Sequence, residues 1–371
     1  MRIALFSGNY NYLKEGANQA LNKLAGYLEA QEGCEVRAYS PVTDTPAFEP
    51  AGTLVPVKSI TLPMRNEFRL ALGLPSEIRR DLEKFRPDIV HVSTPDILGT
   101  RAQTFAKELG VPVVASMHTR FETYLDYYGL GWLRPLAQAH LDRFYRRSDH
   151  VLAPTDALVS ELSALRGDTR TSVWSRGIDR NQFHPGRRDP EWRRAQGLAD
   201  DDIVILFFGR LVLEKGIDTF ISVVRALQQT VPARALVVGA GPAAAAFRSL
   251  PGTVLTGHLE GMDLARAVAS ADIMISPSTT ETFGNVLLEA MASGLAVISA
   301  DAPNARTLLV DGETGVLCSP RHIADYVERT MPLALSMVER RSLGAAARQA
   351  SADYSWDAAS RSVAQVYRSL I

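Results

Sequence analysis

Short apolar runs alternate with longer amphipathic stretches along the whole chain, and this alternation restricts the fold more than any other feature of the sequence. Apolar runs of a few residues are typical of strands buried on both faces, and apolar residues three or four apart are typical of helices that cover a sheet. Strands of this kind occur in parallel sheets with helices on both sides, so the sequence predicts an α/β fold. The expected strands are residues 3–6, 89–92, 113–116, 151–153, 203–208, 235–238, 273–275 and 296–299.

A chain of 371 residues is too long for one ordinary core and suits two domains of roughly 150–200 residues each. Gly, Pro and charged residues cluster between residues 174 and 186, and a new series of strands and helices starts at Ile203. We therefore expect two Rossmann-like domains, residues 1–177 and 178–353. The tail, residues 354–371, has the pattern of an amphipathic helix. Ligands of open α/β sheets bind beyond the carboxyl ends of the strands, so a cleft between the domains is the expected site.

The composition is that of a soluble globular chain. Apolar residues make up 46% and charged residues 22%, and the formal net charge of -1 predicts neither a nucleic-acid partner nor a strongly anionic one. Cys34 and Cys318 form no disulfide framework or metal-binding spacing, which fits a reducing compartment. The N-terminal residues lack the apolar core of a signal peptide, and no stretch approaches the ~18 apolar residues of a membrane-spanning helix. We expect a cytoplasmic protein, with any membrane contact peripheral on the inner face of the cell membrane.

Two glutamates mark the segment of residues 276–289, which runs from an expected strand through a polar loop into a helix. Glu281 lies in the loop and Glu289 near the helix start. Backbone N–H groups at a helix N-terminus favour phosphate oxygens, and here they would belong to Phe283, Gly284 and Asn285. Carboxylates beside a phosphate are useful only if they accept hydrogen bonds from hydroxyl groups on either side of it, such as those of a sugar and a ribose. The simpler interpretation is a helix-capping Glu281 and a solvated Glu289.

Two cations follow another expected strand, in residues 207–216. Arg210 comes directly after the strand, next to Gly209, and Lys215 follows in the same loop. Arg can bind two oxygens at once and Lys acts as a point charge. The pair therefore suits a diphosphate leaving group, whose negative charge grows as a glycosidic bond breaks. The alternative is that either cation forms an ordinary surface ion pair.

Taken together, these residues resemble glycosyltransferase family 4, a two-domain family with the GT-B fold, and the resemblance covers essentially the whole chain. Three stretches, residues 117–124, 128–132 and 174–179, resemble a narrower branch of sulfoquinovosyl-diacylglycerol synthases and GDP-mannose-dependent glycolipid mannosyltransferases. The residues that carry the family resemblance are Gly16, His118, Gly177, Asp179, Arg210, Lys215, Glu281 and Glu289.

The resemblance implies two Rossmann-like domains that face each other across a cleft, with the C-terminal helix packing back on the first domain. It implies a retaining hexosyltransferase with a UDP- or GDP-sugar donor, a lipid acceptor, and no metal or other cofactor. The leaving phosphate would help to take the proton of the acceptor.

Each candidate residue receives a role from the same resemblance. Glu281 would bind hydroxyls of the donor sugar, and Glu289 would bind the ribose. Arg210 and Lys215 would stabilise the departing diphosphate, assisted by Gly16 and the amides near Phe283. His118 would contact the sugar near the anomeric centre, although a histidine at a strand end can also be a satisfied core residue. The full set is His118, Arg210, Lys215 and Glu281 as catalytic residues, and Gly16, Gly209, Phe283, Gly284, Asn285 and Glu289 as donor-binding residues.

One segment departs from the family pattern. After the strand at residues 296–300 the family often has a turn of the type Gly-Gly-x-x-Glu, whereas this chain has residues 301–306, with the sequence Asp-Ala-Pro-Asn-Ala-Arg. The donor contacts of that turn are therefore not carried over to this chain.

A second motif points to a different class of protein. Residues 237–244 fit Gly-x-Gly-x-x-Ala after a strand, with Glu260 about twenty residues further on, as in an NAD- or FAD-binding oxidoreductase. The motif falls on an internal strand of the second domain, which favours a close backbone approach to a nucleotide instead. A GT-B epimerase, a phosphorylase and a non-catalytic nucleotide-sugar-binding protein are further alternatives.

An aromatic segment after His118 is the candidate for membrane and acceptor contact. An apolar loop beside a cationic helix face suits anionic lipid head groups. Ordinary core aromatics with a solvated helix face, and a soluble or polysaccharide acceptor, are the alternatives. Arg120 could face an anionic sugar or pair with Glu122. The residues of the segment are Tyr124, Tyr127, Tyr128, Leu130, Trp132 and Leu133, followed by Arg143, Arg146 and Arg147 at helical spacing.

Overall fold

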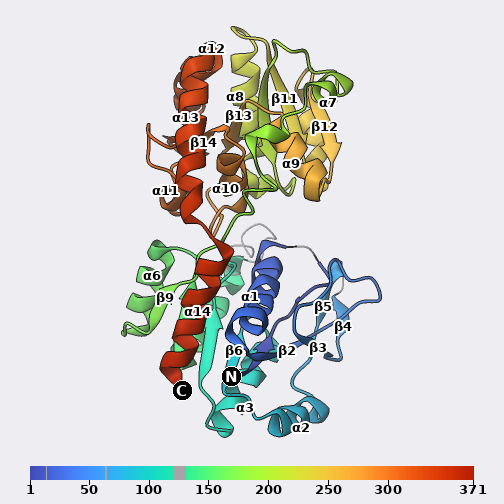
Figure 1. Ribbon diagram of the computed structural model, residues 1–371, viewed down its shortest axis with the longest axis vertical. Helices are drawn as coiled ribbons and strands as arrows, with labels where there is room; N and C mark the ends of the chain where they lie inside the picture. Colours follow the sequence, from blue (N-terminus) through green and yellow to red (C-terminus); the bar gives the residue numbers. More distant parts are fainter. Residues whose placement is uncertain (14, 63–64, 121–130) are drawn as a thin grey trace. The chain divides into compact units, whose positions relative to one another are not determined.

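The structure is a computed structural model that describes residues 1–13, 15–62, 65–120 and 131–371. The chain forms two compact units (Figure 1). The first contains Met1–Gly177 and Trp356–Ile371, and the second contains Ile178–Ser355. Each unit is built on a parallel sheet with covering helices, which confirms the expected α/β fold with two Rossmann-like domains.

The sheet of the first unit has the order β3-β2-β1-β6-β7-β8-β9, and all of its pairs are parallel. The order reverses between β1 and β6, so the loops after these two strands diverge at the carboxyl edge. A small antiparallel pair, β4 and β5, stands apart from this sheet. The elements are β1 (Arg2–Phe6), α1 (Gly16–Glu32), β2 (Glu35–Ser40), β3 (Thr53–Pro56), β4 (Ile60–Leu62), β5 (Arg65–Leu70), α2 (Ser76–Phe85), β6 (Ile89–Val92), α3 (Ile97–Glu108), β7 (Val113–Ser116), η1 (Gly131–Leu133), α5 (Arg134–Arg147), β8 (His150–Ala153), α6 (Asp156–Arg166) and β9 (Thr171–Val173).

The C-terminal helix α14 (Trp356–Leu370) belongs to the first unit. Ala359, Val363 and Tyr367 recur every four residues and are buried, so one face of the helix is apolar. This face packs beside α1 and joins the core on that side of the sheet (Figure 1). The expected return of the C-terminal helix to the first domain is therefore confirmed.

The sheet of the second unit has the order β12-β11-β10-β13-β14-β15 and is also parallel. Its order reverses between β10 and β13, and the loops after these strands hold most of the candidate residues. The elements are η2 (Pro185–Arg187), α7 (Pro190–Ala195), β10 (Ile203–Phe208), η3 (Leu213–Lys215), α8 (Ile217–Leu227), β11 (Ala233–Val238), η4 (Pro242–Ser249), β12 (Val254–Gly257), α9 (Gly261–Ala269), β13 (Ile273–Ser276), α10 (Asn285–Ala292), β14 (Ala296–Ala300), α11 (Pro303–Leu308), β15 (Val316–Cys318), α12 (Ile323–Leu335), α13 (Met337–Ala350) and η5 (Ser351–Asp353).

Residues on the two faces of each sheet form separate apolar layers. In the second unit, Ile205 and Phe207 of β10 pack with one set of helices, while Val204 and Leu206 pack with the other. Successive side chains of a strand point to opposite faces, so both sets are buried only when helices cover both sides. Within the described part of the chain, no helix is long and apolar enough to cross a membrane.

Candidate active site

The loop after β10 carries the candidate cations at the point where the strand order reverses. Gly209 and Arg210 follow the strand directly, and Lys215 ends the short helix η3. Arg210 is exposed, whereas the side chain of Lys215 is only 18% exposed. Parallel sheets bind ligands at such a reversal because the two neighbouring loops lead away in opposite directions.

The glycines after β11 allow two loop backbones to touch. A side chain on Gly239 would place its Cβ 1.9 Å from the carbonyl oxygen of Gly209, and Gly239 has a φ of +143°. A Cβ on Gly241 would come within 2.3 Å of the carbonyl oxygen of Leu211. The Gly-x-Gly motif that resembles a dinucleotide fingerprint therefore packs against the loop that holds Arg210. It is followed by η4 and not by an α-helix.

The loop after β13 brings Glu281 to Lys215. The Lys215 ammonium donates a hydrogen bond to Glu281 Oε1 in an ion pair between residues 66 positions apart. Glu281 is 23% exposed, so the pair lies partly out of solvent beside the reversal point. The sequence assigned these residues to different parts of a donor, but in the structure they bind each other.

The helix α10 begins directly after this loop. Gly284 precedes it with a φ of +97°, a left-handed conformation that favours glycine. Phe283 is buried and packs edge-on against Tyr354, with 5.9 Å between the ring centroids. The N–H groups of Leu287 and Leu288 donate to the carbonyl oxygen of Gly284, so the N–H groups that face the end of the loop that holds Glu281 are those of Asn285 and Val286.

Buried polar atoms without partners occur at the start of α10 and in the loop that leads to it. Among the described residues, Ser278 Oγ, Asn285 Oδ1 and Asn304 Oδ1 have no hydrogen-bonding partner. A Cβ on Gly284 would lie 3.1 Å from Asn304 Nδ2, which places Asn304 against the helix start. Buried polar groups normally have partners, so these atoms are candidates to bind a ligand.

Sequence reasoning missed Asn304 because it lies in the segment that departs from the family pattern. That segment begins with Asp301, which accepts two hydrogen bonds from Arg306, at 2.5 and 2.7 Å. This contact lowers the pKa of Asp301 below its ordinary value. Pro303 then starts the short helix α11, and Asn304 follows it. The one feature of the sequence that could have drawn attention to Asn304 is the departure of residues 301–306 from the family pattern.

Glu289 lies one turn into α10 and differs from Glu281 in its surroundings. Among the described residues its carboxylate has neither a hydrogen-bonding partner nor an ion-pairing one. Burial raises its pKa from 4.5 to about 8, although part of its side chain stays in contact with solvent. Burial therefore favours the protonated form of the carboxyl group at neutral pH, in contrast to the solvated glutamate of the simpler interpretation.

We expect Glu289→Gln to gain stability relative to the parent chain as the pH rises from about 5 to about 8. Below pH 4.5 the group is protonated in both folded and unfolded chains, and above it only the unfolded chain ionises until the pH reaches about 8. The parent chain therefore loses unfolding free energy over this range, by less than about 1.4 kcal/mol per pH unit because of partial solvent contact. Thermal melts measure it, with the exposed Glu313→Gln as control. A difference that stays constant with pH would contradict this expectation.

His118 lies in the first unit, just beyond the carboxyl end of β7, and is buried. Its Nε2 lies 2.8 Å from Ser116 Oγ, and its Nδ1 lies 2.8 Å from Arg176 Nη2. Burial and the charge of Arg176 hold its pKa well below the ordinary value. Both ring nitrogens are thus engaged within the protein.

The other candidates of the first unit are placed as follows. Gly16 is the first residue of α1, and the residue before Glu15 lies outside the described residues. Arg120 pairs with Glu161, and Glu122, its expected partner, lies outside the described residues. Positions 124, 127, 128 and 130 of the aromatic segment lie outside them as well.

Comparison with known proteins identifies the family of this chain. Residues 15–182 match the model of Glycosyltransferase Family 4, and residues 202–334 match that of Glycosyl transferases group 1. The GDP-mannose-dependent alpha-mannosyltransferase of Mycolicibacterium smegmatis is 32% identical over 96% of this chain and 94% of its own length. The chain belongs to glycosyltransferase family 4. The sulfoquinovosyl transferase SQD2 of Arabidopsis thaliana is 30% identical over 98% of this chain and 72% of its own length.

Solved structures show that this glycosyltransferase has the GT-B fold of its family. Sucrose-phosphate synthase from Thermosynechococcus elongatus superposes with a TM-score of 0.80 at 18% identity, covering 100% of this chain and 98% of that one. Anabaena HepE, solved in complex with UDP and glucose, superposes with a TM-score of 0.75 at 19% identity over all of both chains. The expected family and its branch, reached from the sequence motifs, are confirmed.

Proposed function

We propose that this glycosyltransferase is a retaining hexosyltransferase that moves a hexose from a nucleoside diphosphate sugar to a membrane lipid. One observation carries the proposal: the ion pair of Lys215 and Glu281 lies beside the start of α10, at the reversal point of the second sheet. A cation, a hydroxyl acceptor and free helix N–H groups are the groups that a sugar diphosphate requires.

When the donor binds, Lys215 and Glu281 exchange their contact with each other for contacts with the donor. The donor diphosphate draws the Lys215 ammonium away from Glu281, and Arg210 adds a second cation from the same loop. Glu281 then accepts hydrogen bonds from sugar hydroxyls, while Glu289 accepts them from the ribose. The bond between the anomeric carbon and the diphosphate oxygen breaks, and the acceptor oxygen bonds to that carbon on the same face.

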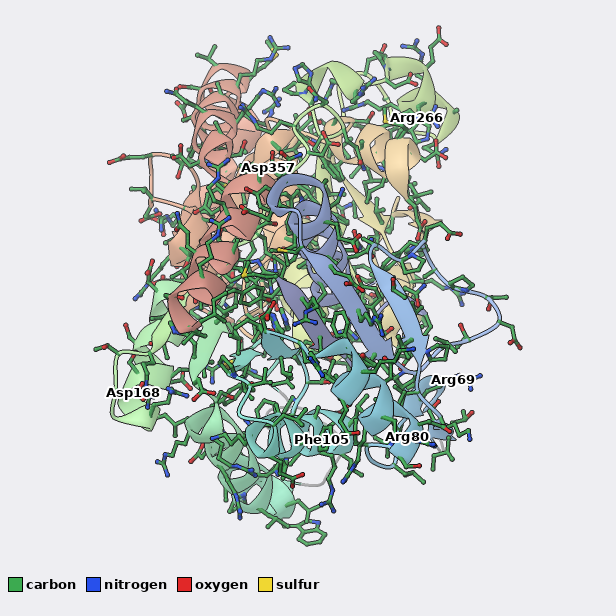
Figure 2. The ribbon with its side chains drawn as sticks, turned by 60° about the horizontal axis from the view of Figure 1, so that its bottom comes forward. Arg69, Arg80, Phe105, Asp168, Arg266 and Asp357 are labelled. Carbon is green, nitrogen blue, oxygen red and sulfur yellow. The ribbon has the colours of Figure 1, made fainter. Side chains whose placement is uncertain are left out.

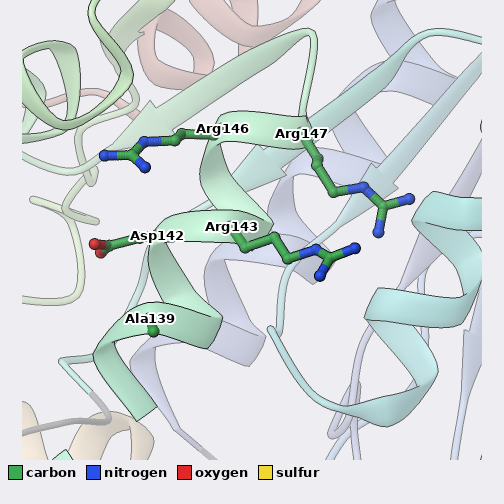
Figure 3. Close-up of a pocket in the computed structure, with 5 residues that line it drawn as sticks. All are labelled: Ala139, Asp142, Arg143, Arg146 and Arg147. Atoms are coloured by element: carbon green, nitrogen blue, oxygen red, sulfur yellow. The ribbon is translucent and has the colours of Figure 1, made fainter. Parts of the chain in front are cut away.

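The lipid acceptor and the membrane contact rest on the relatives and on α5. The relatives include alpha-monoglucosyldiacylglycerol synthases of Acholeplasma laidlawii and Streptococcus pneumoniae, whose product is a glycolipid. Arg143 and Arg147 extend to one side of α5, while Arg146 extends to the other (Figure 3) and donates to the carbonyl of Leu165. The cationic face is therefore narrower than the spacing of the three arginines suggested. Trp132, which is 75% exposed, lies just before α5.

The test is a donor screen with UDP- and GDP-linked hexoses, read by thermal shift, by release of nucleoside diphosphate, and by the anomeric configuration of the product. We expect one donor class to stabilise the protein, to be turned over, and to give a product with the donor's configuration. Turnover that survives EDTA supports the prediction that no metal is needed. A product with inverted anomeric configuration would refute the retaining mechanism. Donor binding without turnover would refute the proposal that this protein catalyses transfer.

A second experiment tests the lipid acceptor. The protein is mixed with vesicles of neutral lipid, or with vesicles of anionic lipid that contain diacylglycerol. We expect flotation with the anionic vesicles and glycosylation of the lipid. The double variant Arg143→Glu/Arg147→Glu should bind them about 10-fold more weakly or worse. Arg80→Glu/Lys84→Glu, with the same spacing on α2, is the charge-matched control, and Figure 2 labels Arg80. Transfer to a soluble saccharide without vesicle binding would overturn the lipid acceptor.

A further inference from the structure

A continuous buried hydrogen-bonded chain crosses the first unit from the C-terminal helix to the linker. Tyr367 of α14 lies 2.5 Å from Nδ1 of His91, and Nε2 of His91 lies 2.7 Å from Ser116 Oγ. Ser116 in turn contacts Nε2 of His118, whose Nδ1 meets Arg176. These five side chains come from α14, β6, the end of β7 and the segment before Gly177, and all belong to one compact unit.

Arg176 fixes the direction of the hydrogen bond at its end of the chain. A guanidinium has only donors, so Arg176 Nη2 donates and Nδ1 of His118 accepts. Burial lowers the pKa of Arg176 only to about 10, so the guanidinium keeps its charge at neutral pH. A neutral imidazole carries one proton, which must then lie on Nε2 and point to Ser116 Oγ.

The surroundings hold both partners in place. Trp174 packs against both, edge-on to His118 with 5.2 Å between the ring centroids, and with its own ring centroid 5.3 Å from Cζ of Arg176. Arg176 Nη1 also donates to the carbonyl oxygens of Trp174 and Ser175, at 3.0 and 3.3 Å. The guanidinium is thus tied to the backbone of its own segment through Nη1, and Nη2 remains directed at His118.

We propose that Arg176 is a positioning residue that occupies the lone pair of His118, so that His118 acts in the transfer as a hydrogen-bond donor through Nε2 and never as the base. This inference rests on the proposed function. An imidazole whose lone pair already accepts a hydrogen bond from a cation has no site for a further proton. In the reaction, an oxygen of the sugar would take the place of Ser116 Oγ and accept the hydrogen bond from Nε2 of His118.

It follows that His118 neither takes up nor releases a proton during the reaction. The bond between the anomeric carbon and the diphosphate oxygen breaks, and the bond between that carbon and the acceptor oxygen forms. The acceptor's proton then leaves on the released diphosphate, which has gained the electron pair of the broken bond. His118 begins and ends this step as the same neutral tautomer.

The direct test is the ring ¹⁵N spectrum of the full chain labelled in its histidines, with His118 assigned by its loss in His118→Gln. We expect the pattern of a neutral Nε2–H tautomer, unchanged between about pH 5.5 and 8.5. The groups that face His118 and could alter it are Arg176, His91 and Ser116. A proton on Nδ1, or a doubly protonated ring in this range, would overturn the proposal. This measurement needs no substrate.

The variants Arg176→Met and Arg176→Lys separate positioning from stability. Methionine removes the donor to Nδ1, so we expect loss of the fixed tautomer and a fall in kcat of about 10- to 100-fold with donor KM within about 3-fold. Lysine can donate to Nδ1 and should restore both the spectrum and most of kcat. If Arg176→Met keeps the Nε2–H pattern and kcat, Arg176 has no positioning role.

Arg166→Met is the matched control for loss of a buried arginine. Arg166 is 1% exposed and pairs with Asp168, which Figure 2 labels in the loop after α6. This variant should lose thermal stability to a degree comparable with Arg176→Met while its His118 spectrum and kcat stay unchanged. If no nucleotide sugar is turned over although His118 shows the Nε2–H pattern, the proposed function fails and the tautomer assignment stands.

Discussion

Replacing Lys215 with alanine is expected to lower kcat by about 10²–10³-fold while the protein remains folded. The ammonium lies beside Glu281 at the reversal point of the second sheet, where the proposed diphosphate gains negative charge as it departs. Removing one preorganised group that stabilises such charge typically costs this factor. The stability cost is small because the pair is partly exposed, so thermal melts should change little.

Two control variants test whether the fall in kcat comes from loss of the positive charge at position 215. Arg225→Ala removes an exposed cation from α8 that donates to Ser249 and should leave kcat within about 2-fold. Lys215→Arg keeps the charge but presents a planar group, so only partial activity should return. Initial rates at saturating donor measure all three variants. Lys215→Ala with kcat within about 3-fold of the parent chain would remove Lys215 from the reaction.

Replacing Gly177 with alanine is expected to destabilise the first unit by about 3 kcal/mol or more, because a Cβ at this position has no room. It would lie 2.1 Å from the backbone nitrogen of Trp356 and 2.6 Å from its Cα. Both atoms belong to the backbone at the start of α14, so relief of the clash requires the helix to shift as a whole. We expect the calorimetric transition of this unit to fall by roughly 6–12 °C.

Gly26→Ala provides a control of opposite sign in the same unit. Gly26 lies within α1, where a Cβ would make only an ordinary contact of 3.5 Å with Ala51. Alanine in place of glycine in a helix interior gains about 0.5–1 kcal/mol, so this variant should melt slightly higher than the parent chain. If Gly177→Ala melts like Gly26→Ala, the close approach of Trp356 to Gly177 is not a constraint on this protein.

The candidate site was only partly predictable from the sequence. Lys215 and Glu281 were found because charged residues in the loops after buried strands are conspicuous, and because their spacing matches a known family. Their mutual ion pair was not predicted, since it joins residues 66 positions apart whose loops meet only through the order of the strands. Asn304 was missed because its segment matches no pattern, and only its burial beside Gly284 draws attention to it.

The fold and the kinds of groups at the strand ends follow from the amino-acid sequence alone. The two periodicities, two residues for strands and 3.6 for helices, are local, so the apolar runs of β10 and the stripe of α14 identify their own buried faces. The protonation state of each group, in contrast, depends on tertiary packing. Packing around α10 buries Glu289 and favours its protonated form, and His118 is neutral because it is buried and lies beside the charge of Arg176. Burial and hydrogen bonding between distant segments set protonation, and no local pattern records them.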